Sequence, residues 1–209
     1  MLFRSGPGGL GKTRLAQEIA RLSSLPRVHV IELATIGHAD EILGAIADSL
    51  HVRETVNRID RNATGPDLRR RVIAALSTGP NLLVLDNCEH LIDGVAAIVN
   101  DLLTAVADLR ILTTSRTPLR HTAEHVYLLG QLPPAEAKEL FAGRARAARP
   151  TVTIDDDIVS SLVDHLDGLP LAIELAAART RTLTPEAILA NLTDRFALLR
   201  GTEIGRAHV

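Results

Sequence analysis

Aromatic residues are scarce in this sequence: three Phe, one Tyr and no Trp make up 2% of its 209 residues. The core must therefore be built from Leu, Val, Ile and Ala, which agrees with a hydrophobic fraction of 46%. A chain of this length can fold as one sizeable domain, or as one domain with part of another.

The sequence also lacks a second cysteine, a large net charge and long apolar runs. The single cysteine, Cys88, excludes an internal disulfide and favours a reducing compartment, so we expect a cytoplasmic protein with Cys88 as a small buried residue. A net charge of −2 gives no sign of a nucleic-acid or membrane surface. No apolar run reaches the ~20 residues of a membrane span, and no signal peptide is apparent.

Glycine, by contrast, is concentrated near the start. Residues 6–13 read Gly-Pro-Gly-Gly-Leu-Gly-Lys-Thr and match the phosphate-binding pattern G-x-x-x-x-G-K-[ST]. In such a loop successive backbone N–H groups point at the phosphates, and the helix that follows adds the positive end of its dipole. We expect Lys12 to act on the phosphates and Thr13 to offer its hydroxyl to Mg²⁺. The glycines that permit the bend are Gly6, Gly8, Gly9 and Gly11.

The same letters allow other interpretations. Gly6, Gly8 and Gly11 also spell G-x-G-x-x-G, the dinucleotide fingerprint, and Glu32 lies about 20 residues further on, where a ribose-binding acid belongs. This alternative predicts an NAD-dependent oxidoreductase. A glycine turn without a ligand is a third possibility. We favour the nucleotide loop because Lys12 and Thr13 follow the glycines in register and have no task in a dinucleotide site.

Segments typical of strands and helices alternate up to about residue 132. The run 81–86, Asn-Leu-Leu-Val-Leu-Asp, is typical of a strand buried on both faces of a parallel sheet. The alternation predicts an α/β fold, with a three-layer parallel sheet of the P-loop NTPase type over residues 1–132. We expect the first strand, before the loop, to be truncated. Strands are expected at 27–33, 81–86, 109–114 and 125–129, helices at 13–24, 39–50, 66–76 and 90–107, and a polar loop at 51–65.

From residue 133 the pattern is helical only. Helices are expected at 134–148 and 155–166, with a third opening after Gly168 and a fourth capped by Thr184. Residues 133–200 are therefore predicted to form a small helical lid subdomain. Residues 201–209 have neither a helical nor a strand period and read like a translated sequencing adapter, so we expect an unstructured tail of artefactual origin.

The second half of the nucleotide site is predicted at the end of the strand 81–86. Asp86 ends this strand, and in phosphate-loop proteins an acid there holds Mg²⁺ through water, together with a hydroxyl such as that of Thr13. The next residue, Asn87, is not acidic. Glu89 is the nearest carboxylate that can orient an attacking water, although it can equally well cap the next helix.

Arg116 follows the strand 109–114. Its guanidinium is expected to reach a γ-phosphate and report its presence, since the carboxyl ends of neighbouring parallel strands meet where ligands bind. The alternative is a surface arginine that pairs with a carboxylate. The candidate catalytic residues are Lys12, Asp86, Glu89 and Arg116.

Together these motifs resemble the nucleotide-binding domain of the NB-ARC, or AP-ATPase, branch of STAND signalling ATPases, an AAA-like group. The residues within these motifs are most similar to those of large bacterial LuxR-type and antibiotic-pathway transcriptional regulators. The resemblance covers about residues 1–200. It is carried by 6–16, by 82–91 (Leu-Leu-Val-Leu-Asp-Asn-Cys-Glu-His-Leu), by 111–116 (Ile-Leu-Thr-Thr-Ser-Arg) and by 168–172 (Gly-Leu-Pro-Leu-Ala).

The resemblance implies a switch controlled by ATP and ADP, with Mg²⁺. In this family the helical subdomain folds over the nucleotide, the proline matching Pro170 touches it, and the arginine matching Arg116 senses the γ-phosphate. ADP holds a closed monomer and ATP favours a form that self-associates. The family's winged helix, sensor repeats and DNA-binding domain have no counterpart here, so any DNA contact belongs to a domain absent from this chain. We expect slow ATP hydrolysis at most; the alternative is a nucleotide-bound scaffold that never hydrolyses.

Overall fold

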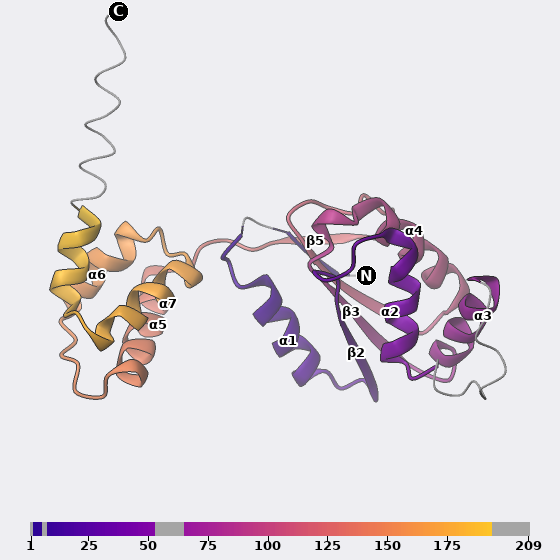
Figure 1. The fold of residues 1–209 in the computed structure, drawn as a ribbon, viewed down its shortest axis with the longest axis horizontal. Helices are drawn as coiled ribbons and strands as arrows, with labels where there is room; N and C mark the ends of the chain where they lie inside the picture. The colour runs from indigo at the N-terminus through magenta and orange to yellow at the C-terminus, as the bar shows by residue number, and fades with distance from the viewer. Residues whose placement is uncertain (1, 6–7, 53–64, 194–209) are drawn as a thin grey trace, which may run out of the picture. The chain divides into compact units, whose positions relative to one another are not determined.

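The computed structural model describes residues 2–5, 8–52 and 65–193. The chain divides into two compact units, Met1–Gly8 with Lys12–Leu129 and Gly9–Gly11 with Gly130–Val209. Figure 1 shows strands and helices in the first of these and helices in the second.

A parallel sheet organises the first unit. Its strands lie in the order β2-β3-β4-β1-β5, and every pairing between neighbours is parallel. The strands are β1 (Leu2–Ser5), β2 (Arg27–Glu32), β3 (Asn81–Asp86), β4 (Leu109–Ser115) and β5 (His125–Leu128). The helices are α1 (Lys12–Leu22), α2 (Ile42–Ser49), α3 (Gly65–Leu76) and α4 (Ile92–Ala105), with 3-10 turns η1 (Ala39–Glu41) and η2 (Cys88–His90).

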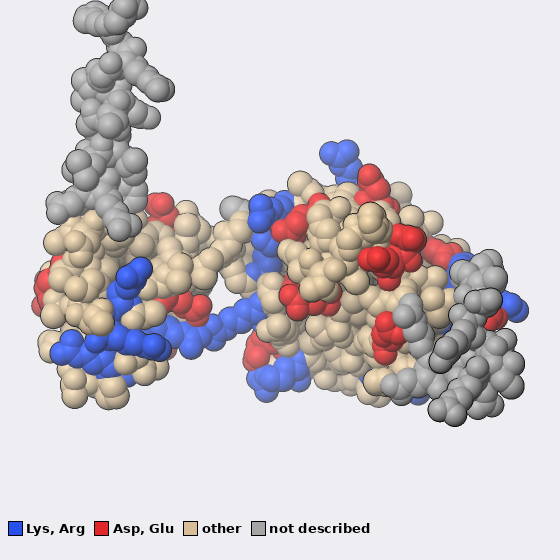
Figure 2. Space-filling model, viewed as in Figure 1, with Lys and Arg blue, Asp and Glu red and all other residues tan. Residues whose placement is uncertain are grey.

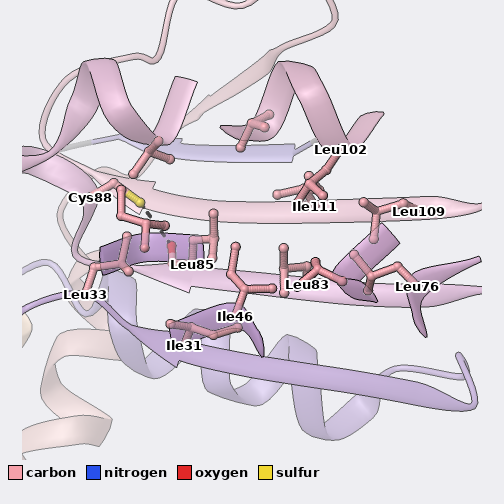
Figure 3. Close-up of a cluster of buried hydrophobic side chains, with 14 of the residues drawn as sticks. Ile31, Leu33, Ile46, Leu76, Leu83, Leu85, Cys88, Leu102, Leu109 and Ile111 are labelled. Carbon is pink, nitrogen blue, oxygen red and sulfur yellow. Dashed lines mark hydrogen bonds between the residues drawn. The ribbon is translucent and has the colours of Figure 1, made fainter. Parts of the chain in front are cut away.

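The strand β3 explains why the sheet has helices on both faces. All six of its residues are buried. Because side chains alternate along a strand, Leu83 and Leu85 pack with α2, α3 and α4, whereas Leu82 and Val84 pack with Ala16 of α1 on the other face. Figure 3 shows the first of these clusters, which is built from aliphatic residues and the buried Cys88. The predicted α/β fold with a parallel sheet between helices is confirmed.

Two helices begin differently from their sequence pattern. The helix expected over 39–50 starts with the 3-10 turn η1 before α2, and the helix expected over 90–107 is preceded by η2 and starts at Ile92. The cause of the second difference is Asn87, whose φ of 64° is left-handed and breaks the path from β3 into a helix. The predicted loop 51–65 falls mostly on residues 53–64, outside the described residues.

The second unit is helical, as its pattern predicts. It contains α5 (Pro134–Ala148), α6 (Asp156–His165), α7 (Pro170–Ala178), the 3-10 turn η3 (Arg179–Arg181) and helical residues at 185–193. Asp155 caps α6, because its carboxylate accepts the backbone N–H groups of Asp157 and Ile158 at 2.9 and 3.1 Å. The predicted cap Thr184 accepts the N–H of Ala187 at 3.4 Å. The predicted tail 201–209 lies outside the described residues.

Both signs of charge are interspersed over the surface that Figure 2 draws, in agreement with the net charge of −2. Within the described ranges, none of the helices has the length and apolar character that crossing a membrane requires.

Gly94 of α4 is expected to be essential for packing. A Cβ at this position would collide with the Cβ of Ala39 and lie 3.3 Å from Cδ1 of Ile42. Gly94→Ala should therefore lower the free energy of unfolding by about 1–3 kcal/mol, although alanine favours a helix by about 1 kcal/mol. Gly143→Ala in α5 is the matched control, because nothing lies within 4 Å of its added Cβ. Urea unfolding should show opposite signs for the two variants; stabilisation by Gly94→Ala would contradict this packing.

Candidate functional site

The phosphate loop leads directly into α1, which begins at Lys12. Gly6 and Pro7 lie outside the described residues. Gly9 and Gly11 have φ values of 83° and 81°, in the left-handed region that side chains disfavour. Other residues would be strained at these two positions. The turn that the glycines make leads the chain into the N-terminus of α1.

The strand order brings three strand ends together beside this loop. β4 lies between β1 and β3, and all three strands are parallel. The loop after β1, Asp86 at the end of β3 and Arg116 after β4 consequently lie at the same edge of the sheet. The sequence predicts convergence at this edge, but not which strand separates the other two.

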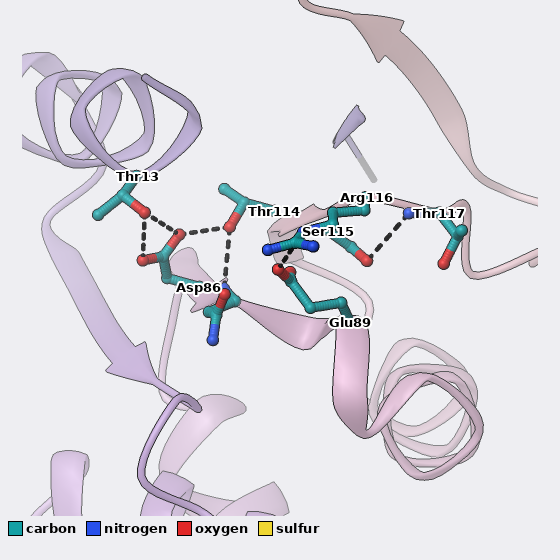
Figure 4. Close-up of polar contacts among 8 residues, drawn as sticks. Thr13, Asp86, Glu89, Thr114, Ser115, Arg116 and Thr117 are labelled. Carbon is teal, nitrogen blue, oxygen red and sulfur yellow. Dashed lines mark hydrogen bonds and ion pairs between the residues drawn. The ribbon is translucent and has the colours of Figure 1, made fainter. Parts of the chain in front are cut away.

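Thr13 and Asp86 meet directly at this edge, as Figure 4 shows. The Thr13 hydroxyl donates to the Asp86 carboxylate, at 2.8 Å from Oδ2 and 3.1 Å from Oδ1. Asp86 is only 5% exposed, and hydrogen bonds of this kind offset the cost of burying a polar carboxyl group. Residues 73 positions apart in sequence thus form one cluster of oxygen atoms.

Thr114 is a member of this cluster that the sequence reasoning missed. Its hydroxyl donates to Oδ1 of Asp86 and accepts the backbone N–H of Asn87 at 3.0 Å. Two adjacent threonines lie near the end of β4, just before Ser115, and only the alternation of side chains along the strand decides which of them faces Asp86. The sequence therefore indicates that either Thr113 or Thr114 can contact Asp86, but it does not indicate which one.

Lys12 lies near the carboxylates of Asp86 and Glu89. Partial burial lowers the pKa of its ammonium group below the ordinary value of 10.5, and the positive charge of Arg116 acts in the same direction. The negative charges of Glu89 and Asp86 oppose this shift. An ammonium group that has lost hydration in this way gains from an additional anion, so the local electrostatics favour a phosphate.

Arg116 and Glu89 form an ion pair with each other, with 3.1 Å between Nε and Oε1. The arginine side chain is 65% exposed and the glutamate 23%. The side-chain amide nitrogen of Asn87, in the orientation that satisfies its neighbours, donates to both oxygens of Glu89 at 3.1 and 3.2 Å. A Cβ added to Gly8 would lie 3.9 Å from Nη2 of Arg116. The pair therefore stands beside the phosphate loop, and Glu89 lies in the turn η2 rather than in a helix.

Pro170 opens α7 in the second unit. Its Gly-Leu-Pro-Leu-Ala segment has a structural role there. Gly168 has a φ of 60°, and a Cβ on it would lie 2.7 Å from the carbonyl oxygen of Leu132. The N–H of Leu132 donates to the Gly168 carbonyl at 3.0 Å. Glycine is thus required between α6 and α7, and Pro170 supplies a favourable first helical residue.

Glu32 does not fit the dinucleotide alternative. A ribose-binding acid stands at the end of the strand next to the loop strand. Glu32 ends β2, and both β3 and β4 separate β2 from β1. Three strand spacings amount to roughly 14 Å, so Glu32 and the loop cannot share one ribose and its phosphates. The strand order overturns this interpretation.

Solved structures share this fold. A chain of the Drosophila ORC bound to DNA matches with a TM-score of 0.64 at 16% identity, covering 100% of this chain and 62% of that chain. Cdc6p from Pyrobaculum aerophilum matches with a TM-score of 0.62 at 16% identity, over 91% of this chain and 56% of that one. A STAND protein with a tetratricopeptide repeat sensor from Pyrococcus horikoshii gives 0.55 at 17% identity, over 93% and 30%. At these identities the likenesses show that the chains share a fold.

Residues 1–131 match the AAA domain family, and the chain belongs to that family. Two curated relatives come from Mycobacterium tuberculosis. The uncharacterised protein Rv0894 is 40% identical over 210 residues, which cover 94% of this chain and 50% of that protein. Rv0890c, named as an HTH-type transcriptional regulator, is 39% identical over 201 residues, which cover 94% of this chain and 22% of that protein. The chain thus spans half or less of these relatives.

Proposed function

We propose that this chain is the ATP/ADP-binding switch module of a signal-transduction ATPase, of the NB-ARC branch of STAND proteins, within a larger bacterial transcriptional regulator. The observation that carries the proposal is the meeting of Thr13 and Asp86 at 2.8 Å beside Lys12. A nucleotide tail with its metal ion needs this combination of groups. The relative named as a regulator and the STAND structure support the wider assignment.

Mg²⁺ fits the donors of this site. Among the described residues no three His, Cys, Asp or Glu side chains come together as a metal cage. Mg²⁺ in nucleotide sites uses one or two protein oxygens with phosphate and water, rather than such a cage. Thr13 and Asp86 would hold the ion, which neutralises phosphate charge when bound. Lys12 and the loop N–H groups would hold the phosphates themselves.

Arg116 and Glu89 are proposed to respond to the γ-phosphate. Their ion pair is accessible to solvent on the arginine side. A γ-phosphate would compete with Glu89 for the guanidinium, since arginine binds phosphate and carboxylate in the same forked geometry. Release from Arg116 would leave Glu89 able to orient a water molecule. The proposed hydrolysis is slow, because Asn87 stays hydrogen-bonded to that carboxylate.

The switch itself is proposed to be a population shift. ATP and ADP differ only in the γ-phosphate. The contacts of this group would therefore decide which of two arrangements of the protein is more populated. Pro170 is proposed to read the bound nucleotide from the helical subdomain, and the ATP form to self-associate in the full-length protein. Any DNA contact would be made by a domain outside this chain. A scaffold that binds nucleotide without turnover is the second candidate, favoured by the absence of an acid at Asn87.

Calorimetric titration with ADP and Mg²⁺, and separately with NAD, tests the proposed function. We expect saturable binding of ADP at one site per chain and weak or undetectable binding of NAD. Tight NAD binding with no response to ADP and Mg²⁺ would contradict the proposal. Phosphate release by the full-length protein, with Lys12→Ala as the inactive reference, separates a slow ATPase from a scaffold.

Arg116→Ala should weaken binding of a non-hydrolysable ATP analogue by about three- to tenfold and leave ADP binding unchanged. A hydrogen bond to a charged group contributes about 1.5–3 kcal/mol, and the exposure of Arg116 reduces that value. Arg110→Ala is the matched control, because Arg110 is an exposed arginine near the start of β4, the strand that Arg116 follows. An equal loss for ATP analogue and ADP would remove the sensing role.

A further inference from the structure

The hydroxyl of Thr114 stands between the two halves of the proposed site. It donates to the Asp86 carboxylate and accepts the backbone N–H of Asn87. Asp86 belongs to the metal side of the site, whereas Asn87 leads to Glu89 and through it to Arg116. The Thr114 hydroxyl thus contacts Asp86 and the backbone of the next residue; Figure 4 shows these contacts and, separately, the ion pair of Arg116 with Glu89.

Burial makes the direction of these hydrogen bonds definite. Thr114 is 1% exposed, and a hydroxyl has one proton to donate. A backbone N–H can only donate, so Thr114 accepts from Asn87 and its own proton goes to Asp86. Oδ1 of Asp86 is therefore occupied from the side of β4, and the carboxylate plane is fixed relative to Thr13, which bonds more closely to Oδ2.

We infer that Thr114 is a positioning residue for the metal carboxylate Asp86. This inference rests on the proposed nucleotide function and adds a residue to it. Partners of this kind fix the orientation of a ligating group, and their loss typically reduces metal affinity about 10- to 100-fold. Thr114 touches neither nucleotide nor metal in this account; it acts through Asp86 and, by holding the Asn87 N–H, through the left-handed turn at Asn87.

The adjacent threonine provides a matched control. Thr113 is 0% exposed, and its hydroxyl oxygen has no hydrogen-bond partner among the described residues. Thr113→Val and Thr114→Val therefore make the same chemical change at neighbouring buried positions of one strand. Only the second change removes a contact with Asp86.

The test titrates Mg²⁺ at a fixed concentration of a fluorescent, non-hydrolysable ATP analogue. Thr114→Val should raise the Mg²⁺ concentration for half-maximal binding about tenfold, at the low end of the range for such partners. Thr113→Val and Thr114→Ser should stay within about twofold of the wild type, because serine keeps the hydroxyl. Affinity for the analogue in EDTA should be the same in all four proteins, whereas a merely structural defect would lower it.

Equal Mg²⁺ requirements for Thr114→Val and Thr113→Val would overturn the role of Thr114 while the nucleotide function stands. A wild-type protein that binds the analogue equally well in Mg²⁺ and EDTA would overturn both. Circular dichroism at the assay temperature shows which variants are folded. If Thr114→Val is not, Thr114→Cys takes its place, because a thiol is a weak donor and a weak acceptor; its Mg²⁺ requirement should rise in the same direction, and an unchanged value would count against the role.

Discussion

Lys12→Ala is expected to reduce the affinity for ADP by at least about 30-fold. Removing one partner of a desolvated, hydrogen-bonded charge pair costs about 2–5 kcal/mol, and every 1.4 kcal/mol is about a factor of ten in the dissociation constant. The side chain already shows the loss of hydration, because burial lowers its pKa despite the neighbouring carboxylates. A bound phosphate would add further negative charge beside this partly buried ammonium group, so its affinity should depend on Lys12.

Lys138→Ala is the control for this variant, since the sequence contains only these two lysines. Lys138 lies on α5, and its Nζ pairs with Asp156 at 2.8 Å. Its loss should leave ADP affinity unchanged. Lys12→Ala should also melt no earlier than the wild type without nucleotide, because the depressed pKa means that folding disfavours the charged form of Lys12. Unchanged ADP affinity in Lys12→Ala would remove the site assignment.

Asp86→Asn is expected to raise the Mg²⁺ requirement for binding an ATP analogue by about 100-fold, at the upper end of the effects seen when metal-site groups are changed. Asparagine has the shape of aspartate but no charge, so the change removes the attraction for the ion and keeps the packing around Thr13 and Thr114. The isosteric variant is preferred over alanine for this reason. Fluorescence titration with Mg²⁺ provides the measurement.

Glu32→Gln is the matched control for Asp86→Asn. Glu32 ends β2 and is paired in register with Asp86 at the end of β3, but its side chain is exposed. A carboxylate one strand away should contribute almost nothing to the Mg²⁺ requirement. A similar loss in both variants would mean that general negative charge at this edge, and not the Asp86 carboxylate, attracts the ion. The same control tests the dinucleotide alternative, in which Glu32 would be essential.

Much of the site could be predicted from the sequence because its parts are local. The loop at 6–13 needs glycines and a lysine in a fixed order, and Asp86 follows a run that is buried on both faces. What could not be predicted depends on contacts between strands. The strand order β2-β3-β4-β1-β5 cannot be predicted from any single segment, because all strands of a parallel sheet have a similar local sequence pattern.

The polar contacts around Glu89 likewise depend on residues from different parts of the chain. The sequence allowed Glu89 to orient water or cap a helix, and it allowed Arg116 to sense a phosphate or pair with a carboxylate. In the structure the two questions are linked, because Arg116 forms an ion pair with the carboxylate of Glu89 itself. The left-handed Asn87 sets this geometry by making η2 start two residues after β3. Such a conformation at a non-glycine residue is not predictable from residue type alone.

The most direct test of the central claim is to count bound metal with Mn²⁺ in place of Mg²⁺, by electron paramagnetic resonance. The claim is that Thr13 and Asp86 jointly hold the ion of a nucleotide whose phosphates lie in the glycine loop. We predict one Mn²⁺ per chain only when an ATP analogue is present, with at least tenfold weaker retention in Thr13→Val. Mn²⁺ retained equally by the wild type and Thr13→Val, or bound equally without nucleotide, would contradict the account.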